Sequence, residues 1–150
     1  DFIKKVTSSL ELFDAHTKDR LARALYLFHN GLTALIDAQS FLSIYGGLNL
    51  LIADVAKKKE GKKKEIGKTT RREDIAAVAF AKQGILEISE VIEWIENFER
   101  FDATHYATLH GSKLKKEDLN EIKSFFKEFL MKYIEYEKVR HEEQLLNSRQ

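Results

Sequence analysis

Residues 119–136 read LNEIKSFFKEFLMKYIEY, and the spacing of their apolar side chains decides the fold class. Six of these side chains recur at intervals of 3-4-3-4-3: Leu119, Ile122, Phe126, Phe129, Tyr133 and Tyr136. On an α-helix that spacing gathers all six onto one stripe. The stretch therefore predicts a long helix that begins near Lys115. Its aromatic stripe is expected to form the core of a bundle or to contact another chain.

The composition of the whole chain supports the same fold class. The chain has 150 residues, with no proline, seven glycines and no cysteine, a composition that favours helices over sheets. We therefore predict one all-α domain over residues 1–150. The absence of cysteine suits a reducing cytoplasm, where we expect the protein to lie. We do not expect it in a membrane, because no apolar run approaches 18 residues. Since Met131 is the only methionine, we also expect a longer gene product.

Apolar periodicity divides the rest of the chain into further helices. A first helix is predicted over residues 2–15, and a second, with Thr17 as its N-cap, to about Tyr45. Gly46-Gly47 predicts a break, followed by a short helix over residues 48–56. The spacing of Thr70 and Glu73 is that of a capping box, which predicts a long helix from there to about Phe98. The expected architecture is a bundle of four long helices and one short helix.

A strongly basic segment separates the two halves of this bundle. Residues 57–72, KKKEGKKKEIGKTTRR, hold nine basic and two acidic side chains, so their net charge is +7 while the remaining residues are net −6. We predict an exposed loop with helix ends at its margins. Such a segment can bind RNA phosphates without reading sequence, and it can equally be an inert solvated loop. The candidate nucleic-acid-binding residues are Lys57, Lys58, Lys59, Lys62, Lys63, Lys64, Lys68, Arg71 and Arg72.

A second segment, ERFDATHYATLHG at residues 99–111, interrupts the apolar rhythm. We predict that residues 99–114 form a polar connection at a helix end, where the backbone can bring Arg100 and His105 together. Histidine can take a proton from a ribose 2′-hydroxyl, and arginine can stabilise the charge that develops on phosphorus. The alternative interpretation is a plain loop in which Arg100 pairs with Glu96 or Glu99 and His105 is solvated.

The stretch RFDATH followed by Tyr106, between two long helices of an all-α domain, resembles the HEPN superfamily with its Arg-x4-6-His motif. The resemblance implies metal-independent RNA cleavage by a dimeric protein of a defence or toxin–antitoxin system. It implies Arg100 and His105 as catalytic residues, with Asp102 or Tyr106 orienting the imidazole or contacting phosphate. HEPN members that only bind RNA or nucleotides also exist.

A different class of function is compatible with the same residues. In that class the chain is a non-catalytic helical subunit that coats nucleic acid or docks in a larger assembly, through the basic segment and the stripe of the last helix. Neither hypothesis calls for a cofactor or a metal, because no paired Glu-x-x-His or HExxH pattern occurs. The expected partners are RNA and a second copy or a helical protein.

Overall fold

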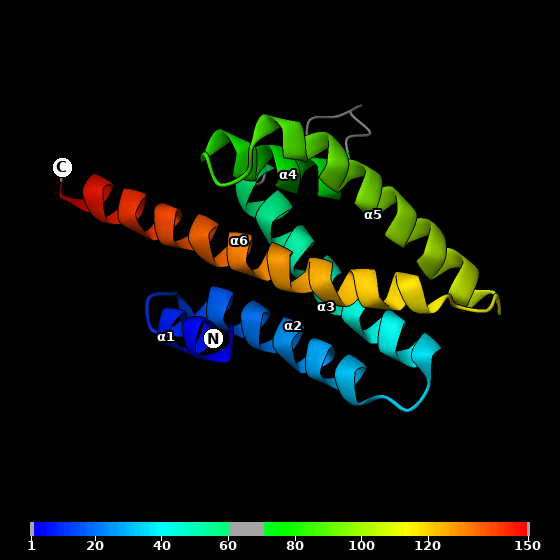
Figure 1. Ribbon diagram of the computed structural model, residues 1–150. Helices are drawn as coiled ribbons and strands as arrows, with labels where there is room; N and C mark the ends of the chain where they lie inside the picture. Colours follow the sequence, from blue (N-terminus) through cyan, green and yellow to red (C-terminus); the bar gives the residue numbers. More distant parts are fainter. Residues whose placement is uncertain (1, 61–70, 150) are drawn as a thin grey trace.

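The computed structural model describes residues 2–60 and 71–149 and contains six α-helices there (Figure 1). The all-α prediction is confirmed, with one helix more than expected. The helices are α1 (Phe2–Leu10), α2 (Ala15–Thr33), α3 (Asp37–Glu60), α4 (Arg72–Lys82), α5 (Ile88–Leu109) and α6 (Lys116–Ser148).

Helix α6 runs through the middle of the molecule (Figure 1). It passes between α1 and α2 on one side and α4 and α5 on the other, and α3 crosses behind it. Its C-terminal turns extend past the other helices, and Leu145 and Leu146 are exposed there. The helix starts one residue after the predicted position, and its 33 residues span about 50 Å at 1.5 Å per residue.

The predicted aromatic stripe of α6 is the centre of the core. All six of its members are at most 5% exposed. The ring of Phe126 stacks on Phe28 of α2 with centroids 4.4 Å apart, and Phe129 lies 5.2 Å from Phe80 of α4. Rings from α2 and α4 therefore both pack on the aromatic stripe of α6, which agrees with a central position of this helix.

The start of α2 differs from the prediction. Helix α1 ends at Leu10, and α2 begins at Ala15 with Asp14 as its N-cap. The Asp14 carboxylate accepts a hydrogen bond from the Thr17 backbone N–H at 2.8 Å, as N-cap side chains do. The prediction of Thr17 as the cap was wrong: Thr17 is buried inside the first turn.

The break between α2 and α3 also lies elsewhere than predicted. It falls at Ala34 to Ile36, and α3 continues through Gly46-Gly47 without interruption. The two glycines serve packing instead of ending a helix. A Cβ atom at Gly47 would lie 2.8 Å from the Ala24 carbonyl oxygen and 3.2 Å from Phe126. The missing side chain thus allows α2, α3 and α6 to approach closely.

Because of this close approach, alanine substitutions at Gly46 and Gly47 are expected to change the free energy of unfolding in different ways. Gly47→Ala is expected to lower the free energy of unfolding by about 1–3 kcal/mol, because the new methyl group overpacks the junction. At Gly46 the nearest atom to a Cβ would be Leu27 Cδ1 at 3.7 Å, an ordinary contact. Gly46→Ala is therefore expected to be neutral or to stabilise by up to about 1 kcal/mol, through helix propensity. Urea titrations of the two variants would measure the difference, and equal effects would contradict this account of the junction.

The long helix predicted from residue 70 to Phe98 is two helices. Helix α4 ends at Lys82, and the chain turns at Gly84, whose φ of +72° is a conformation that side chains rarely allow. Helix α5 then continues to Leu109. The prediction that residues 99–114 form a connection was therefore wrong for residues 99–109, which are helical. Trp94, Phe98 and Phe101 anchor them in the core.

The basic segment is partly helical. Lys57, Lys58 and Lys59 form the last turn of α3, where cations complement the helix dipole. Residues 61–70, including Thr70 and the lysines at 62, 63, 64 and 68, lie outside the described residues. None of the helices in the described ranges is long and apolar enough for a bilayer crossing.

Candidate functional site

Arg100 and His105 lie on the same helix and do not share a site within one chain. Five residues at 100° per residue separate their side chains by about 140° around the axis of α5. Arg100 pairs with Glu121 of α6, whereas the ring of His105 lies against Tyr45 of α3. The core residue Phe101 separates these two directions.

Arg100 borders a polar hollow between α5 and α6. Its guanidinium contacts the Glu121 carboxylate and donates to the Asn97 side-chain oxygen at 3.2 Å. The hollow has a volume of about 410 Å³ and is also lined by Asn120, Ser124 and Phe125. The alternative interpretation expected Arg100 to pair with Glu96 or Glu99. Its ion-pair partner is instead Glu121, 21 positions further along the chain, and the spacing of residues in the sequence could not indicate this pair.

His105 belongs to a cluster that joins three helices. Its imidazole stacks on the phenol ring of Tyr45 with centroids 4.1 Å apart and an interplanar angle of 19°. The Tyr45 hydroxyl donates a hydrogen bond to one oxygen of Asp102, and the Arg71 guanidinium pairs with the other oxygen. Asp102 therefore connects Arg71, at the start of α4, to Tyr45 and His105. We call these four residues the Tyr45–His105 cluster.

The cluster is accessible and its groups differ in charge. Arg71 and Asp102 are each about one third exposed. Burial lowers the pKa of His105, and the nearby Asp102 charge offsets this only in part, so the pKa lies below the ordinary value of 6.5. Neither nitrogen of the His105 ring has a hydrogen-bond partner among residues 2–60 and 71–149. The imidazole is thus neutral at pH 7 and free to accept a proton.

Two other groups of the cluster are strongly influenced by their neighbours. Burial and the hydrogen bond to Asp102 raise the pKa of Tyr45 to about 12, so its phenol stays protonated. Burial tends to lower the pKa of Arg71, but Glu73 and Asp102 outweigh it and raise the pKa above its ordinary value. Arg71 also lies 3.4 Å from Glu73 and 3.5 Å from Glu99.

Sequence reasoning identified half of this cluster. Asp102 and His105 were predicted from the motif, whereas Arg71 was predicted only as a phosphate-binding residue and Tyr45 was not predicted as a site residue. Asp102 is 57 residues from Tyr45 and 31 from Arg71. Tyr106, the fourth predicted residue, is 65% exposed and packs against His110, with ring centroids 4.1 Å apart. Tyr106 is therefore not part of the cluster.

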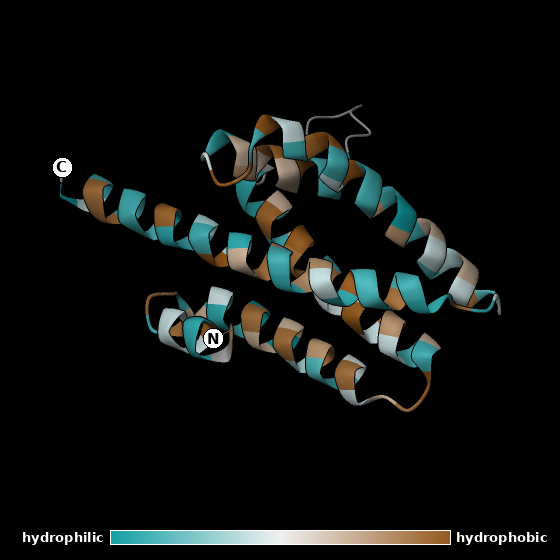
Figure 2. Cartoon of the chain, viewed as in Figure 1, coloured by the Kyte–Doolittle hydropathy of each residue, from teal (hydrophilic) through white to brown (hydrophobic). Residues whose placement is uncertain are grey.

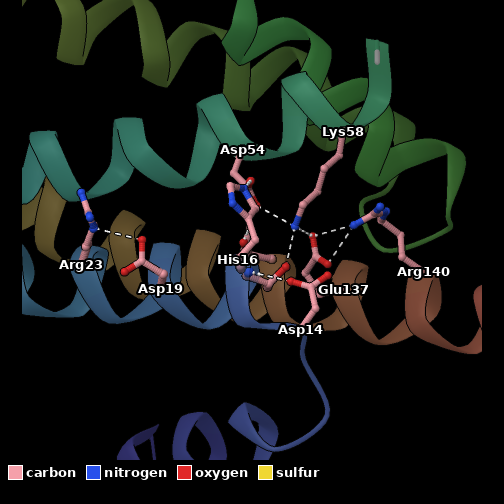
Figure 3. A network of polar contacts seen from close by, with 10 residues as sticks. Asp14, His16, Asp19, Arg23, Asp54, Lys58, Glu137 and Arg140 are labelled. Atoms are coloured by element: carbon pink, nitrogen blue, oxygen red, sulfur yellow. Dashed lines mark hydrogen bonds and ion pairs between the residues drawn. The ribbon is translucent and has the colours of Figure 1, made fainter. Parts of the chain in front are cut away.

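A second polar network is buried where α2, α3 and α6 meet (Figure 3). The Lys58 ammonium donates to the Asp54 carboxylate at 2.8 Å, to Glu137 at 2.7 Å and to the Thr17 hydroxyl at 2.8 Å. All three of its donors are thus satisfied inside the protein, and its side chain is only 12% exposed. The prediction of Lys58 as a nucleic-acid contact does not fit this environment. Lys57 and Lys59 on either side of it are exposed.

The remaining members of this network surround the buried carboxylates. The Tyr133 hydroxyl donates to Asp54 at 2.6 Å, and His16 lies 3.2 Å from the other Asp54 oxygen. Burial would raise the pKa of Asp54, but the hydrogen bonds from Lys58 and Tyr133 outweigh it, so the pKa lies below its ordinary value. Arg140 contacts Glu137 at 3.0 Å at the edge of a hollow of about 350 Å³. The network thus places paired charges inside the bundle.

No group of three or more potential metal ligands occurs among the residues that the structure describes. The searches for similar proteins found no family model, no curated protein and no solved structure that matches this chain.

Proposed function

We propose that this chain is an RNA-binding domain of the HEPN type that cleaves RNA without a metal ion, at the Tyr45–His105 cluster. The observation that carries the proposal is that Asp102 connects a guanidinium, on Arg71, to a site that holds a neutral imidazole, on His105. The composition of the site is the one that the motif requires, but Arg71 takes the place of Arg100.

The reaction assigned to this cluster is an intramolecular phosphoryl transfer. The His105 imidazole takes the proton of a ribose 2′-hydroxyl, whose oxygen attacks phosphorus and forms a 2′,3′-cyclic phosphate. The bond from phosphorus to the 5′-oxygen breaks, and that oxygen takes a proton from water. Arg71 stabilises the charge on the phosphoryl oxygens, while Asp102 orients the guanidinium and the Tyr45 phenol keeps Asp102 in place.

The experiment is a cleavage assay on mixed single-stranded RNA in the presence of EDTA. We expect products that end in a 2′,3′-cyclic phosphate, and we expect DNA of the same sequence to stay intact because it lacks the 2′-hydroxyl. Arg71→Ala is expected to reduce the rate about 10–100-fold, the range for losing a hydrogen bond to a charged group. Arg100→Ala is the matched control and should leave the rate unchanged. The reverse result would assign the chemistry to Arg100.

RNA binding is proposed to use the lysines of the basic segment, of which Lys57 and Lys59 are exposed in the last turn of α3. Lys57→Glu with Lys59→Glu, or Lys62, Lys63 and Lys64 reversed together, should weaken binding to all RNA sequences alike. The slope of log affinity against log salt should flatten by roughly 0.7 for each RNA phosphate that the variant no longer neutralises. Reversal of Lys115 and Lys116, exposed at the start of α6, serves as the control. An unchanged slope in the first two variants would remove the basic segment from the interface.

A second function is favoured by the partners of Arg71. Three carboxylates, on Glu73, Glu99 and Asp102, surround this one guanidinium, so the site has an excess of negative charge that opposes a phosphate. On this alternative the chain is a non-catalytic helical subunit that binds nucleic acid or docks in a larger assembly. RNA binding without cleavage, across varied RNAs, would favour it.

The wider setting of either function is also a proposal. We place the protein in the cytoplasm, within a defence or toxin–antitoxin system, as a homodimer or bound to a helical partner. Leu145 and Leu146, exposed near the end of α6, are consistent with a contact there. Sedimentation of the purified chain over a range of concentrations would test the homodimer, and a monomer at every concentration would exclude it.

A further inference from the structure

The outer face of α5 carries large apolar side chains that the fold leaves uncovered. Ile88 is 83% exposed, Ile92 is 66% exposed and Tyr106 is 65% exposed. On a helix these three lie within about 40° of one another around the axis, so they share one face. Ile88 and Tyr106 are about 27 Å apart along that face, at 1.5 Å per residue. We call the three residues the α5 stripe.

Acidic side chains accompany this stripe. Helix α5 contains five acidic residues and one arginine, and that arginine, Arg100, is paired with Glu121. Glu96 and Glu99 are exposed and lie along the helix between the isoleucines and Tyr106, each within about 40° of Ile92 around the axis. In Figure 2 brown residues mark the first turns of α5 and hydrophilic residues follow in its middle. The face is therefore apolar with a negative centre.

Within the part of the chain that the structure describes, one cation outside α5, Arg71, pairs with an acidic residue of this face. From the start of α4, Arg71 approaches Glu99 at 3.5 Å, but Asp102 and Glu73 engage the same guanidinium. Among residues 2–60 and 71–149, the negative charge of this face is therefore largely uncompensated. Exposed isoleucines that are backed by carboxylates match a partner with the opposite pattern, in which an apolar face is flanked by cations.

We propose that the α5 stripe is the docking surface for an amphipathic helix of another protein, with leucine or isoleucine on one face and lysine or arginine at its edges. Such a helix covers Ile88 and Ile92 with its apolar face and pairs its cations with Glu96 and Glu99. A second copy of this chain fits less well. Antiparallel pairing of two α5 stripes would set Glu96 and Glu99 against the same residues of the copy, and like charges repel.

The test uses the full chain and a labelled 20-residue helical peptide with a leucine face and lysine and arginine edges. Fluorescence anisotropy should show saturable binding with one peptide per chain, weakened by added salt. Ile88→Ser with Ile92→Ser should weaken binding at least about tenfold, because two buried isoleucines are lost. Glu96→Lys, which leaves the partners of Arg71 intact, should weaken it several-fold.

Two controls make the result decisive. Tyr26→Ser with Leu32→Ser removes exposed apolar side chains from α2 and should leave peptide binding unchanged. A peptide with the same leucine face and glutamate edges should not bind. Equal binding of both peptides, absence of binding, or binding that survives Ile88→Ser with Ile92→Ser would overturn the proposal. Self-association that the same double variant abolishes would also overturn it, because the occupant would then be a second copy.

Discussion

Replacing His105 with alanine is expected to reduce RNA cleavage about 10²–10⁴-fold, the range that general acid–base catalysis contributes. RNA affinity and stability should change little, because the imidazole is only partly buried and has no hydrogen-bond partner among the described residues. The measurement is a single-turnover rate beside a binding isotherm for each protein. A parallel loss of rate and affinity would point to a binding role instead.

The pH dependence of cleavage gives a second measure of the same residue. Burial holds the pKa of His105 below 6.5, and only the neutral imidazole accepts a proton. Cleavage should therefore be constant near pH 7 and fall as the pH decreases through the lowered pKa. His110→Ala is the matched control, since His110 is exposed and packs on Tyr106. A rate that rises on acidification would identify His105 as an acid in the rate-limiting step.

The second large effect is expected on stability. Lys58→Met keeps the aliphatic stem but removes the ammonium that contacts Asp54 and Glu137, whose side chains are 1% and 5% exposed. Removing one partner from a buried ion pair leaves an uncompensated charge and costs about 3–5 kcal/mol. Urea unfolding at pH 7 would measure the loss. Lys59→Met, one residue further along and exposed, should change stability by less than about 0.5 kcal/mol.

The sign of the pH effect distinguishes lost charge pairing from lost packing. In the wild type the pKa of Asp54 is lowered, so its contribution to stability is present at neutral pH and is lost as the pH falls through the lowered pKa. Without Lys58, burial dominates at Asp54 and the neutral carboxyl group becomes the favoured form. The difference between wild type and Lys58→Met should therefore shrink at pH 4. A difference that is independent of pH would mean that packing of the stem is responsible.

The spacing of apolar residues predicted a helix well where those residues form one continuous buried stripe. The 3-4 spacing from Leu119 to Tyr136 located α6 because every member of that stripe is buried. The helix breaks were harder to predict. The real break at Ala34 to Ile36 contains neither glycine nor proline, whereas Gly46-Gly47 lies inside α3 because packing against Ala24 and Phe126 needs the space. Glycine can end a helix or serve its packing, and sequence alone does not distinguish these roles.

The candidate site was predictable only where its residues are neighbours in sequence. Asp102 and His105 lie one helical turn apart, so the motif included both. Tyr45 and Arg71 reach Asp102 only through the packing of α3 and α4 against α5. Arg100 and His105 were expected to converge through a bend at residues 99–114, whereas residues 99–109 continue α5, whose buried side chains are Trp94, Phe98 and Phe101, and the two side chains point in different directions within one chain.

The central position of α6 has a consequence for how the chain folds during synthesis. Its rings complete the contacts of Phe28 in α2, Phe80 in α4 and Trp94 in α5, yet α6 follows all of these helices in the sequence. Before α6 has been synthesised, the preceding helices can already pack on one another, above all α2 on α3 and α3 on α4, but their aromatic side chains lack the rings of α6. The core is therefore completed only after α6 emerges, and a nascent chain that stalls before it leaves Phe28, Phe80 and Trp94 without these partner rings, an apolar surface of the kind that chaperones bind.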